Sequence, residues 1–207
     1  WPDHLTKGEE RAKAHFLTEF MREVRTLAVT AARRCGHSVK IGVRVDARLE
    51  DALMRGKDVR TWVREGLVDL VIPSPWYSGT DFDLPFAEWK RELTKLNSSI
   101  EVYPASEDGV ALRGKRCRRM TMKDYRDFAD RMYEQGAKGL YFFNLFGFRE
   151  SAQHRKVWDE IVRTGLPPRT VGVSASRGGT LVVEPGGLTL EDAVVMPRDR
   201  RQDDHGP

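Results

Sequence analysis

The sequence contains few cysteines and no long apolar segment, and each absence argues against a class of protein. Only Cys35 and Cys117 occur in 207 residues, and neither has a cysteine or histidine neighbour at metal-ligand spacing. A disulfide-rich scaffold or a Cys-x-x-Cys zinc site is therefore not expected, whereas free thiols or a single Cys35–Cys117 disulfide both stay open. No apolar run approaches the roughly 20 residues of a membrane-spanning helix. We therefore expect no membrane partner.

Glycine-rich phosphate loops and histidine clusters are also missing. The turns that follow the apolar runs contain neither Gly-x-Gly-x-x-Gly nor Gly-x-x-x-x-Gly-Lys, the patterns that bind nucleotide phosphates. The five histidines are scattered, without the spacing of a metal centre or a catalytic triad. We therefore expect neither a cofactor nor a metal ion.

The positive charge of the chain is modest and spread out. The formal net charge is +4, and much of the excess lies in two short runs at residues 115–119 and 198–201. Thirty-one acidic residues are mixed throughout the sequence, and no helical pattern carries a basic stripe. Such runs are more typical of solvated loops than of phosphate contacts, so no nucleic-acid partner is expected.

Helical and strand patterns alternate along most of the chain. Apolar residues at three- and four-residue steps predict a long helix over residues 7–35, with Phe16, Phe20 and Leu27 on its buried face and Gly36 at its end. Strands are predicted at residues 39–45, 67–72, 100–103 and 139–144, the second stopping at Pro73 and the third at Pro104. The predicted helices that follow them cover residues 49–63 in one or two pieces, 86–96, 121–132 after a capping box of Thr121 and Asp124, and 157–162.

This alternation predicts parallel strands with crossover helices, in an open sheet or a (β/α)₈ (TIM) barrel. Two features favour the barrel. A helix precedes the first strand, as if it closed a βα unit whose strand lies outside the chain, and the strand-to-helix turns are polar and aromatic. We therefore expect the C-terminal half of a barrel, strands five to eight, over residues 1–166. Residues 167–207 are expected to form a C-terminal extension with short strands and a disordered tail.

The middle of the chain carries the most specific pattern. It reads Ile-Gly-Val-Arg-Val-Asp over residues 41–46 and Gly-Lys-Asp-Val-Arg-Thr-Trp-Val-Arg-Glu-Gly-Leu-Val-Asp-Leu-Val-Ile-Pro-Ser over residues 56–74. An arginine-containing strand followed by a helix ending in Trp-x-x-x-Gly-x-Val-Asp resembles the glycosyl-hydrolase-like barrel proteins of planctomycete-type bacteria. The resemblance covers roughly residues 1–165. It implies that an acidic motif of the fourth barrel strand lies just outside this chain.

The resemblance also implies where catalytic carboxyl groups would stand. Barrels of this kind place them after the fourth and seventh strands, and glycosidic cleavage uses one as acid and the other as base or nucleophile. The seventh-strand position corresponds to residues 103–108, where Glu107 is the first candidate for nucleophile or base and Asp108 the second. Alternatively, Glu107-Asp108-Gly109 is only a polar turn.

Two charged residues of the first predicted strand are candidates for substrate binding. Arg44 lies within an apolar strand, so it either points into the barrel mouth or forms an ion pair with Asp69 or Glu101. Asp46 is either a carboxylate at the rim or a helix N-cap.

The remaining candidates for substrate binding are mostly aromatic. Trp76 and Tyr77 are either walls on which a sugar ring stacks or anchors of their loop. Tyr103 ends the third strand, and Asn144 ends the fourth, where it would donate to a ligand hydroxyl or cap the next turn. Three other tryptophans, at helical spacing among apolar residues, are predicted to pack in the core: Trp62, Trp89 and Trp158.

These features predict a barrel that acts on a carbohydrate through paired carboxylates, one of them outside this chain. A non-catalytic barrel that binds a sugar or serves as a scaffold stays open, as does an open α/β domain that binds a small molecule. If the strands share one mouth, the loops at 73–81 and 104–109 must open on the same edge. Half a barrel has unpaired strand edges, so its expected partners are a carbohydrate and either the missing half or a second copy. The sequence leaves the cellular location open.

Overall fold

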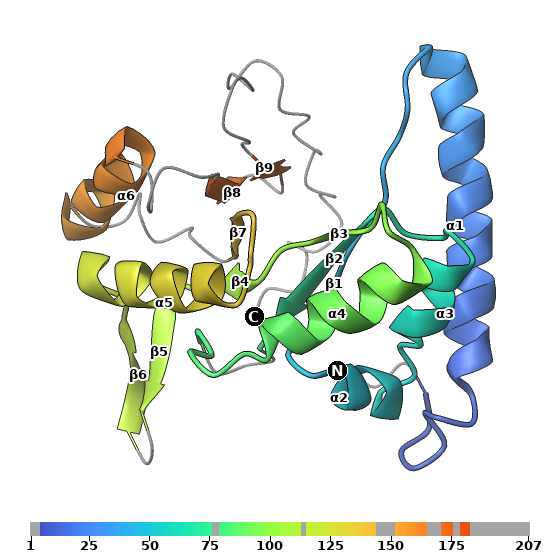
Figure 1. Ribbon diagram of the computed structural model, residues 1–207, viewed down its shortest axis with the longest axis horizontal. Helices are drawn as coiled ribbons and strands as arrows, with labels where there is room; N and C mark the ends of the chain where they lie inside the picture. The colour runs from blue at the N-terminus through green and yellow to red at the C-terminus, as the bar shows by residue number, and fades with distance from the viewer. Residues whose placement is uncertain are drawn as a thin grey trace, which may run out of the picture.

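The computed structural model describes residues 5–75, 79–112, 115–143, 152–164, 171–175 and 179–182 (Figure 1). The helices are α1 (Ala14–Cys35), α2 (Leu49–Met54), α3 (Val59–Arg64), α4 (Phe86–Leu96), α5 (Met122–Glu134) and α6 (Ala152–Thr164). The strands are β1 (Gly42–Asp46), β2 (Leu70–Ser74), β3 (Glu101–Val102), β4 (Ala105–Ser106), β5 (Gly109–Leu112), β6 (Lys115–Arg119), β7 (Leu140–Phe142), β8 (Val171–Ala175) and β9 (Gly179–Val182). The predicted mixed α/β order is confirmed, with a hairpin added between β4 and α5.

The parallel strands lie beside one another in the order in which they occur in the chain. β1 pairs with β2, β2 with β3, β4 with β7 and β7 with β8, all in parallel, and β9 returns antiparallel to β8. Tyr103 and Pro104 connect β3 directly to β4, and both take part in hydrogen bonds between strands. The Tyr103 N–H donates to the Val71 carbonyl (3.1 Å), and the Tyr141 N–H donates to the Pro104 carbonyl (3.0 Å). Among the described strands the order never reverses, and they form no closed barrel.

Two prolines that were expected to end strands lie within the paired region instead. Pro73 pairs with Val45 and Ser74 with Asp46, so β2 continues past the predicted stop. A proline lacks the N–H donor, but its fixed φ lies near the extended region, so a strand can include it where that donor is not needed. The strand predicted to stop at Pro104 resumes as β4 for the same reason.

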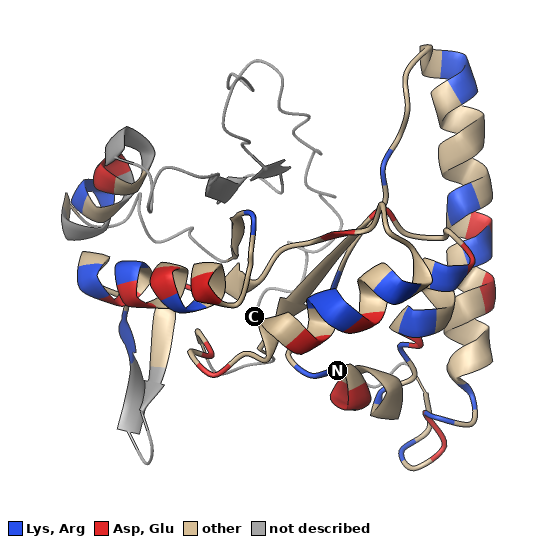
Figure 2. Ribbon diagram, in the orientation of Figure 1, with Lys and Arg blue, Asp and Glu red and all other residues tan. Residues whose placement is uncertain are grey.

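The basic run that was interpreted as a solvated loop is strand β6, antiparallel to β5. The charges at its end are paired: Arg118 donates to both carboxylate oxygens of Asp124 (2.7 and 2.8 Å), and Arg119 donates to Asp108 (2.6 Å). Asp124 also forms the predicted capping box with Thr121 at the start of α5. The Arg118 hydrogen bonds, followed by those from Thr121, hold the pKa of Asp124 well below its usual value. Figure 2 shows that acidic and basic residues continue along α5.

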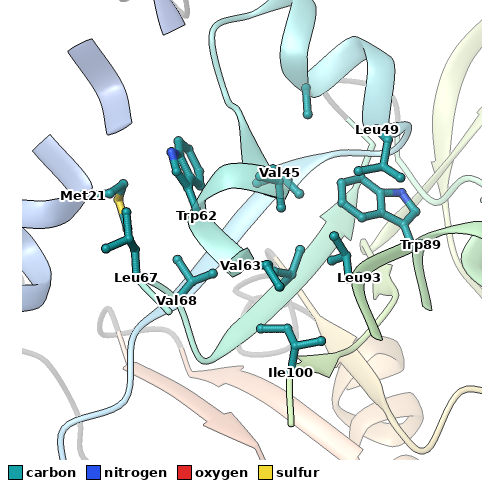
Figure 3. Packing of buried hydrophobic residues seen from close by; sticks show 13 residues of the cluster. Met21, Val45, Leu49, Trp62, Val63, Leu67, Val68, Trp89, Leu93 and Ile100 are labelled. Carbon is teal, nitrogen blue, oxygen red and sulfur yellow. The ribbon is translucent and has the colours of Figure 1, made fainter. Parts of the chain in front are cut away.

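Alternate side chains of β1, β2 and β3 pack beneath the first four helices. Val45, Val71 and Val102 belong to a hydrophobic cluster that includes residues of α1, α2, α3 and α4 (Figure 3). Trp62 and Trp89 lie in this cluster with 5 % and 0 % of their surface exposed, so their predicted core positions are confirmed. The side chain of Trp158 lies outside the described part of the chain.

The next strand continues the same arrangement. Leu140 and Phe142 of β7 pack against the buried residues of α5 and Ile161 of α6 in a second cluster. The opposite face of the strands carries a smaller cluster: Ile72, Tyr103, Ala105 and Tyr141, with Leu70 and Phe143 against them. This cluster contains no helical residue, so within the described chain the helices that contribute to the core pack on one face of the sheet.

Helix α1 begins at Ala14 rather than near residue 7, and its buried face differs from the prediction. The buried residues are Ala14, Thr18, Met21 and Ala28. Phe16, Phe20 and Leu27, predicted to be buried, are 51 %, 57 % and 69 % exposed, so that prediction is wrong. Two stripes of residues at three- and four-residue spacing run along the helix. The stripe with the smaller side chains packs on the core, where Thr18 accepts a hydrogen bond from Trp62 Nε1 (3.0 Å). Gly36 ends the helix in the left-handed conformation, as predicted.

Candidate functional site

The loops that follow β2 and β4 meet at the carboxyl ends of the strands. The Thr80 N–H donates to the Gly109 carbonyl (2.7 Å), and the Glu107 N–H donates to Thr80 Oγ1 (3.0 Å). The Thr80 hydroxyl also lies 3.2 Å from the buried Ser106 hydroxyl. The expectation that the loops at 73–81 and 104–109 open on the same edge is therefore confirmed.

Gly79 allows this close approach. Its φ is +79°, and a Cβ there would lie 2.4 Å from the Gly109 carbonyl oxygen. Any other residue would be strained in this conformation and would also collide with backbone that cannot easily shift. The Gly79–Thr80 pair thus fixes the backbone of residues 107–109 and holds Glu107 in place.

Arg44 and Glu107 lie side by side at this edge, on the face away from the helices. Arg44 Nη1 is 3.7 Å from Glu107 Oε1, and the two side chains are 23 % and 12 % exposed. The guanidinium carbon of Arg44 lies 3.5 Å from the centre of the Phe143 ring, a cation–π contact that fixes its position. Strand alternation explains the arrangement, since Arg44 lies between Val43 and Val45, which face the helices.

The two ion-pair partners proposed for Arg44 from the sequence are wrong. Asp69 pairs with Arg25 (2.9 Å), and Glu101 pairs with Lys40 (3.4 Å), both near the amino ends of the strands. Arg44 is therefore free of these carboxylates, and its partner is the candidate Glu107.

The charges of this pair are only partly compensated. Burial raises the pKa of Glu107 above its usual value; Arg44 acts against this shift, and Asp108 adds to it. Burial lowers the pKa of Arg44, and the carboxylate of Glu107 opposes that change. Arg44 Nη1 is buried and has no hydrogen-bond partner, since 3.7 Å is too long for one. A carboxyl group with a raised pKa, beside an unsatisfied donor, is suited to general acid chemistry and to polar ligands.

Asp46 and Asp108 are engaged in other interactions. The buried Asp46 carboxylate binds Lys57 Nζ (2.8 Å) and Arg55 Nε (3.0 Å) through different oxygens. It does not cap α2, because the N-cap position is Arg48, whose side chain makes no capping bond. Asp108 pairs with Arg119 at the base of the hairpin. Both residues thus have close ion-pair partners, whereas Glu107 pairs with Arg44 only across 3.7 Å.

A pocket of about 450 Å³ opens where β1 and β2 end. Phe82 and Val110 are the larger apolar residues of its lining. Charged side chains dominate the rest: Asp46, Arg48, Asp51, Arg55, Asp81 and Asp83. Arg48 and Asp81 form a 3.1 Å ion pair between its two loops. The volume is in the range of small-molecule sites, and alternating carboxylates and guanidinium groups can hydrogen-bond a ligand rich in hydroxyls.

Of the other predicted site residues, only Tyr103 lies within the described part of the chain. Tyr103 is buried on the same face as Arg44, in the cluster with Ile72 and Tyr141. Trp76, Tyr77 and Asn144 lie outside the described residues. Sequence reasoning missed two contributors. Phe143 could have been found from its alternation with Tyr141, whereas no local signal marks Thr80.

The described residues carry no sign of a metal centre or a membrane-spanning helix. Across the described residues, no group of three or more potential metal ligands gathers, and no helix combines the length and apolarity that crossing a bilayer requires. Comparison of the chain with protein-family models and with curated proteins finds no match. Arg44, Glu107 and their surroundings are therefore the features of the described chain that bear on its function.

Proposed function

We propose that this chain is part of a glycoside-hydrolase-like (β/α)₈ barrel that acts on a carbohydrate, with Glu107 as one of its catalytic carboxyl groups. The observation that carries the proposal is the buried Glu107 beside Arg44 at the carboxyl ends of the strands, on the face away from the helices. The unreversed strand order supports a barrel, because a doubly wound sheet reverses its order at a switch point.

In this proposal Glu107 acts as the general acid. Its raised pKa lets it keep a proton at pH values where an ordinary glutamate has lost one, so it can protonate the oxygen of the leaving sugar. This role differs from the nucleophile or base favoured by the sequence, and the difference follows from burial. The second carboxylate comes from outside this chain.

Side chains on the same face of the sheet supply the proposed substrate contacts. The guanidinium of Arg44, which is partly exposed and has an unsatisfied Nη1, donates to a sugar hydroxyl beside Glu107, and Phe143 packs against its face. The adjoining pocket of about 450 Å³ holds a neighbouring sugar through its carboxylates and guanidinium groups. Trp76, Tyr77, Tyr103 and Asn144 remain proposed substrate contacts.

Oligosaccharide binding tests the proposal on this chain directly. In a panel followed by isothermal titration calorimetry, we expect Arg44→Met and Glu107→Ala to weaken binding at least about tenfold, the loss usual when a buried hydrogen-bonding group is removed. The matched control is the ion pair Lys40–Glu101, at the opposite ends of the strands, altered in the same way. Equal losses at both pairs, or no binding of any oligosaccharide, would contradict the proposal.

Hydrolysis by the complete barrel gives a second readout. Glu107→Gln is expected to lower kcat about 100-fold or more, as for other general acids. Because the active form of Glu107 is protonated, activity should fall as the pH rises through its raised pKa. A rate that instead increases with pH through this range would assign Glu107 to the base.

We further propose that the remaining βα units of the barrel cover the outer edge of β1 and the exposed stripe of α1. Among the described strands, β1 pairs only with β2, so one row of its backbone groups is open to a further parallel strand. The exposed side chains of Phe16, Phe20 and Leu27 give α1 a second apolar surface. A helix needs such a surface when it packs against neighbouring units on two sides.

Without those units, the chain is expected to self-associate through this surface. Light scattering coupled to size-exclusion chromatography should show an oligomer that becomes monomeric in Phe20→Glu/Leu27→Glu. Thr30→Glu, at an exposed polar position of the same helix, is the control and should leave the mass unchanged. A monomeric wild-type chain with a sharp melting transition would overturn this part of the proposal.

A further inference from the structure

A second hollow lies at the other ends of the strands, away from the proposed active site. It is a cleft of about 560 Å³ between the C-terminal half of α1 and the connection over residues 36–40, which runs back beside the helix towards β1 (Figure 1). Asp69, just before β2, also lines it. The cleft shares no lining residue with the 450 Å³ pocket, so the two are separate.

Small apolar side chains form the wall that α1 gives to this cleft. Ala28 and Val29 each lie one helical turn before Ala32, and Val39 lines the cleft from the connecting segment. Larger side chains at the two alanines would fill the space. The wall can therefore accept an apolar group several atoms long.

Positive charge surrounds this wall. Arg25, Arg33 and Lys40 line the cleft, whereas Asp69 is the single acidic residue in its lining. Lys40 also pairs with Glu101, which lies outside the lining, at 3.4 Å. The carboxylate of Asp69 is already engaged, since its Oδ2 accepts from Arg25 Nη2 (2.9 Å) and from the Ile41 N–H (2.7 Å). The cleft thus has more fixed positive than negative charge.

Arg25 supplies an independent sign that a partner group belongs here. Its Nε is buried and has no hydrogen-bond partner, although the same side chain pairs with Asp69 through Nη2. A buried, unsatisfied N–H of a cation costs free energy, and a turn of the Arg25 side chain towards an anionic acceptor in the cleft would recover it.

We infer that this cleft binds a small organic anion, a carboxylate, sulfonate or phosphate group joined to an apolar body. The anionic group lies between Arg25 and Lys40, which approach from opposite walls. The apolar body lies along Ala28 and Ala32. The reverse orientation is disfavoured because the carbonyl end of α1, near Gly36, repels an anion.

Three related probes test the apolar contact and the anionic contact separately. The probe 1-anilinonaphthalene-8-sulfonate has an apolar body and an anion, N-phenyl-1-naphthylamine has only the body, and inorganic phosphate has only the charge. Fluorescence and calorimetric titrations should show that the sulfonate binds with 1:1 stoichiometry and about tenfold more tightly than either of the others, because only it uses both features.

Variants of the cleft locate the binding. Lys40→Glu should weaken sulfonate binding at least about fivefold, as expected for reversing one charge beside an anion, and Ala32→Phe should block the apolar wall. Arg34→Glu makes the same change in net charge beside the cleft without lining it, and it should have less than a twofold effect. The inference is overturned if Arg34→Glu matches Lys40→Glu, if Ala32→Phe changes nothing, or if the neutral probe binds as tightly as the sulfonate.

Discussion

Replacing Trp89 by alanine is expected to lower the free energy of unfolding by about 4 kcal/mol, within the range for large aromatic residues in a core. Trp89 has no exposed surface and belongs to the cluster that α1 to α4 form with β1 and β2, where it lies beside Leu49 (Figure 3). Its indole Nε1 also donates to the Ala47 carbonyl (2.8 Å), which ties α4 to the end of β1. Alanine would leave a cavity and an unsatisfied carbonyl group.

Equilibrium unfolding in urea, followed by circular dichroism, measures this loss. Trp89→Phe keeps most of the ring volume and loses the N–H, so it should cost only about 1–2 kcal/mol. Leu27→Ala, at a position 69 % exposed, should change stability by less than about 0.5 kcal/mol. If Trp89→Ala is no more costly than Leu27→Ala, the packing described around α4 is wrong.

The sequence predicts the order of helices and strands well because each element carries its own periodicity. The glycine at the end of α1 and the capping box of α5 act through backbone groups only a few residues away, so local sequence is sufficient. The choice of packing face on α1 is different. Its two stripes have similar spacing, and only contact with the rest of the fold, such as Trp62 with Thr18, decides which one is buried.

The β5–β6 hairpin was missed for a related reason. A run of basic residues does not resemble a strand, and its end is stabilised by carboxylates from elsewhere: Arg118 binds Asp124 and Arg119 binds Asp108. These partners are six and eleven residues away, outside the run itself. A rule based on local composition therefore assigns the run to a loop.

The candidate site shows the same division between local and long-range information. Arg44 and Glu107 were each identified from the sequence as polar residues at strand ends, but their pairing depends on which strands are neighbours. An ion pair with Asp69 or Glu101 was one of two alternatives for Arg44 in the sequence, and these carboxylates lie near the amino ends of the strands instead. Burial, which gives Glu107 its raised pKa, is likewise a property of the assembled face rather than of the loop sequence.

Asp46→Asn is expected to destabilise the fold by about 3 kcal/mol, in the range for breaking a buried ion pair by removing one partner. The Asp46 carboxylate is almost fully buried and neutralises the largely buried Lys57, with Arg55 on its other oxygen. Asparagine fits the same space, but it supplies no negative charge and replaces one acceptor by an N–H donor facing a cation.

A matched substitution and a double variant show whether burial of the charge is the cause. Asp81→Asn makes the same chemical change in the same pocket, but its partner Arg48 is half exposed, so the cost should stay below about 1 kcal/mol. Adding Lys57→Met to Asp46→Asn removes the buried cation and keeps an apolar side chain of similar length. Urea unfolding should then show the double variant to be more stable than Asp46→Asn alone. If Lys57→Met restores no stability to Asp46→Asn, then Asp46 does not act by neutralising the charge of Lys57. The interpretation of Asp46 as a substrate-binding residue would then regain support.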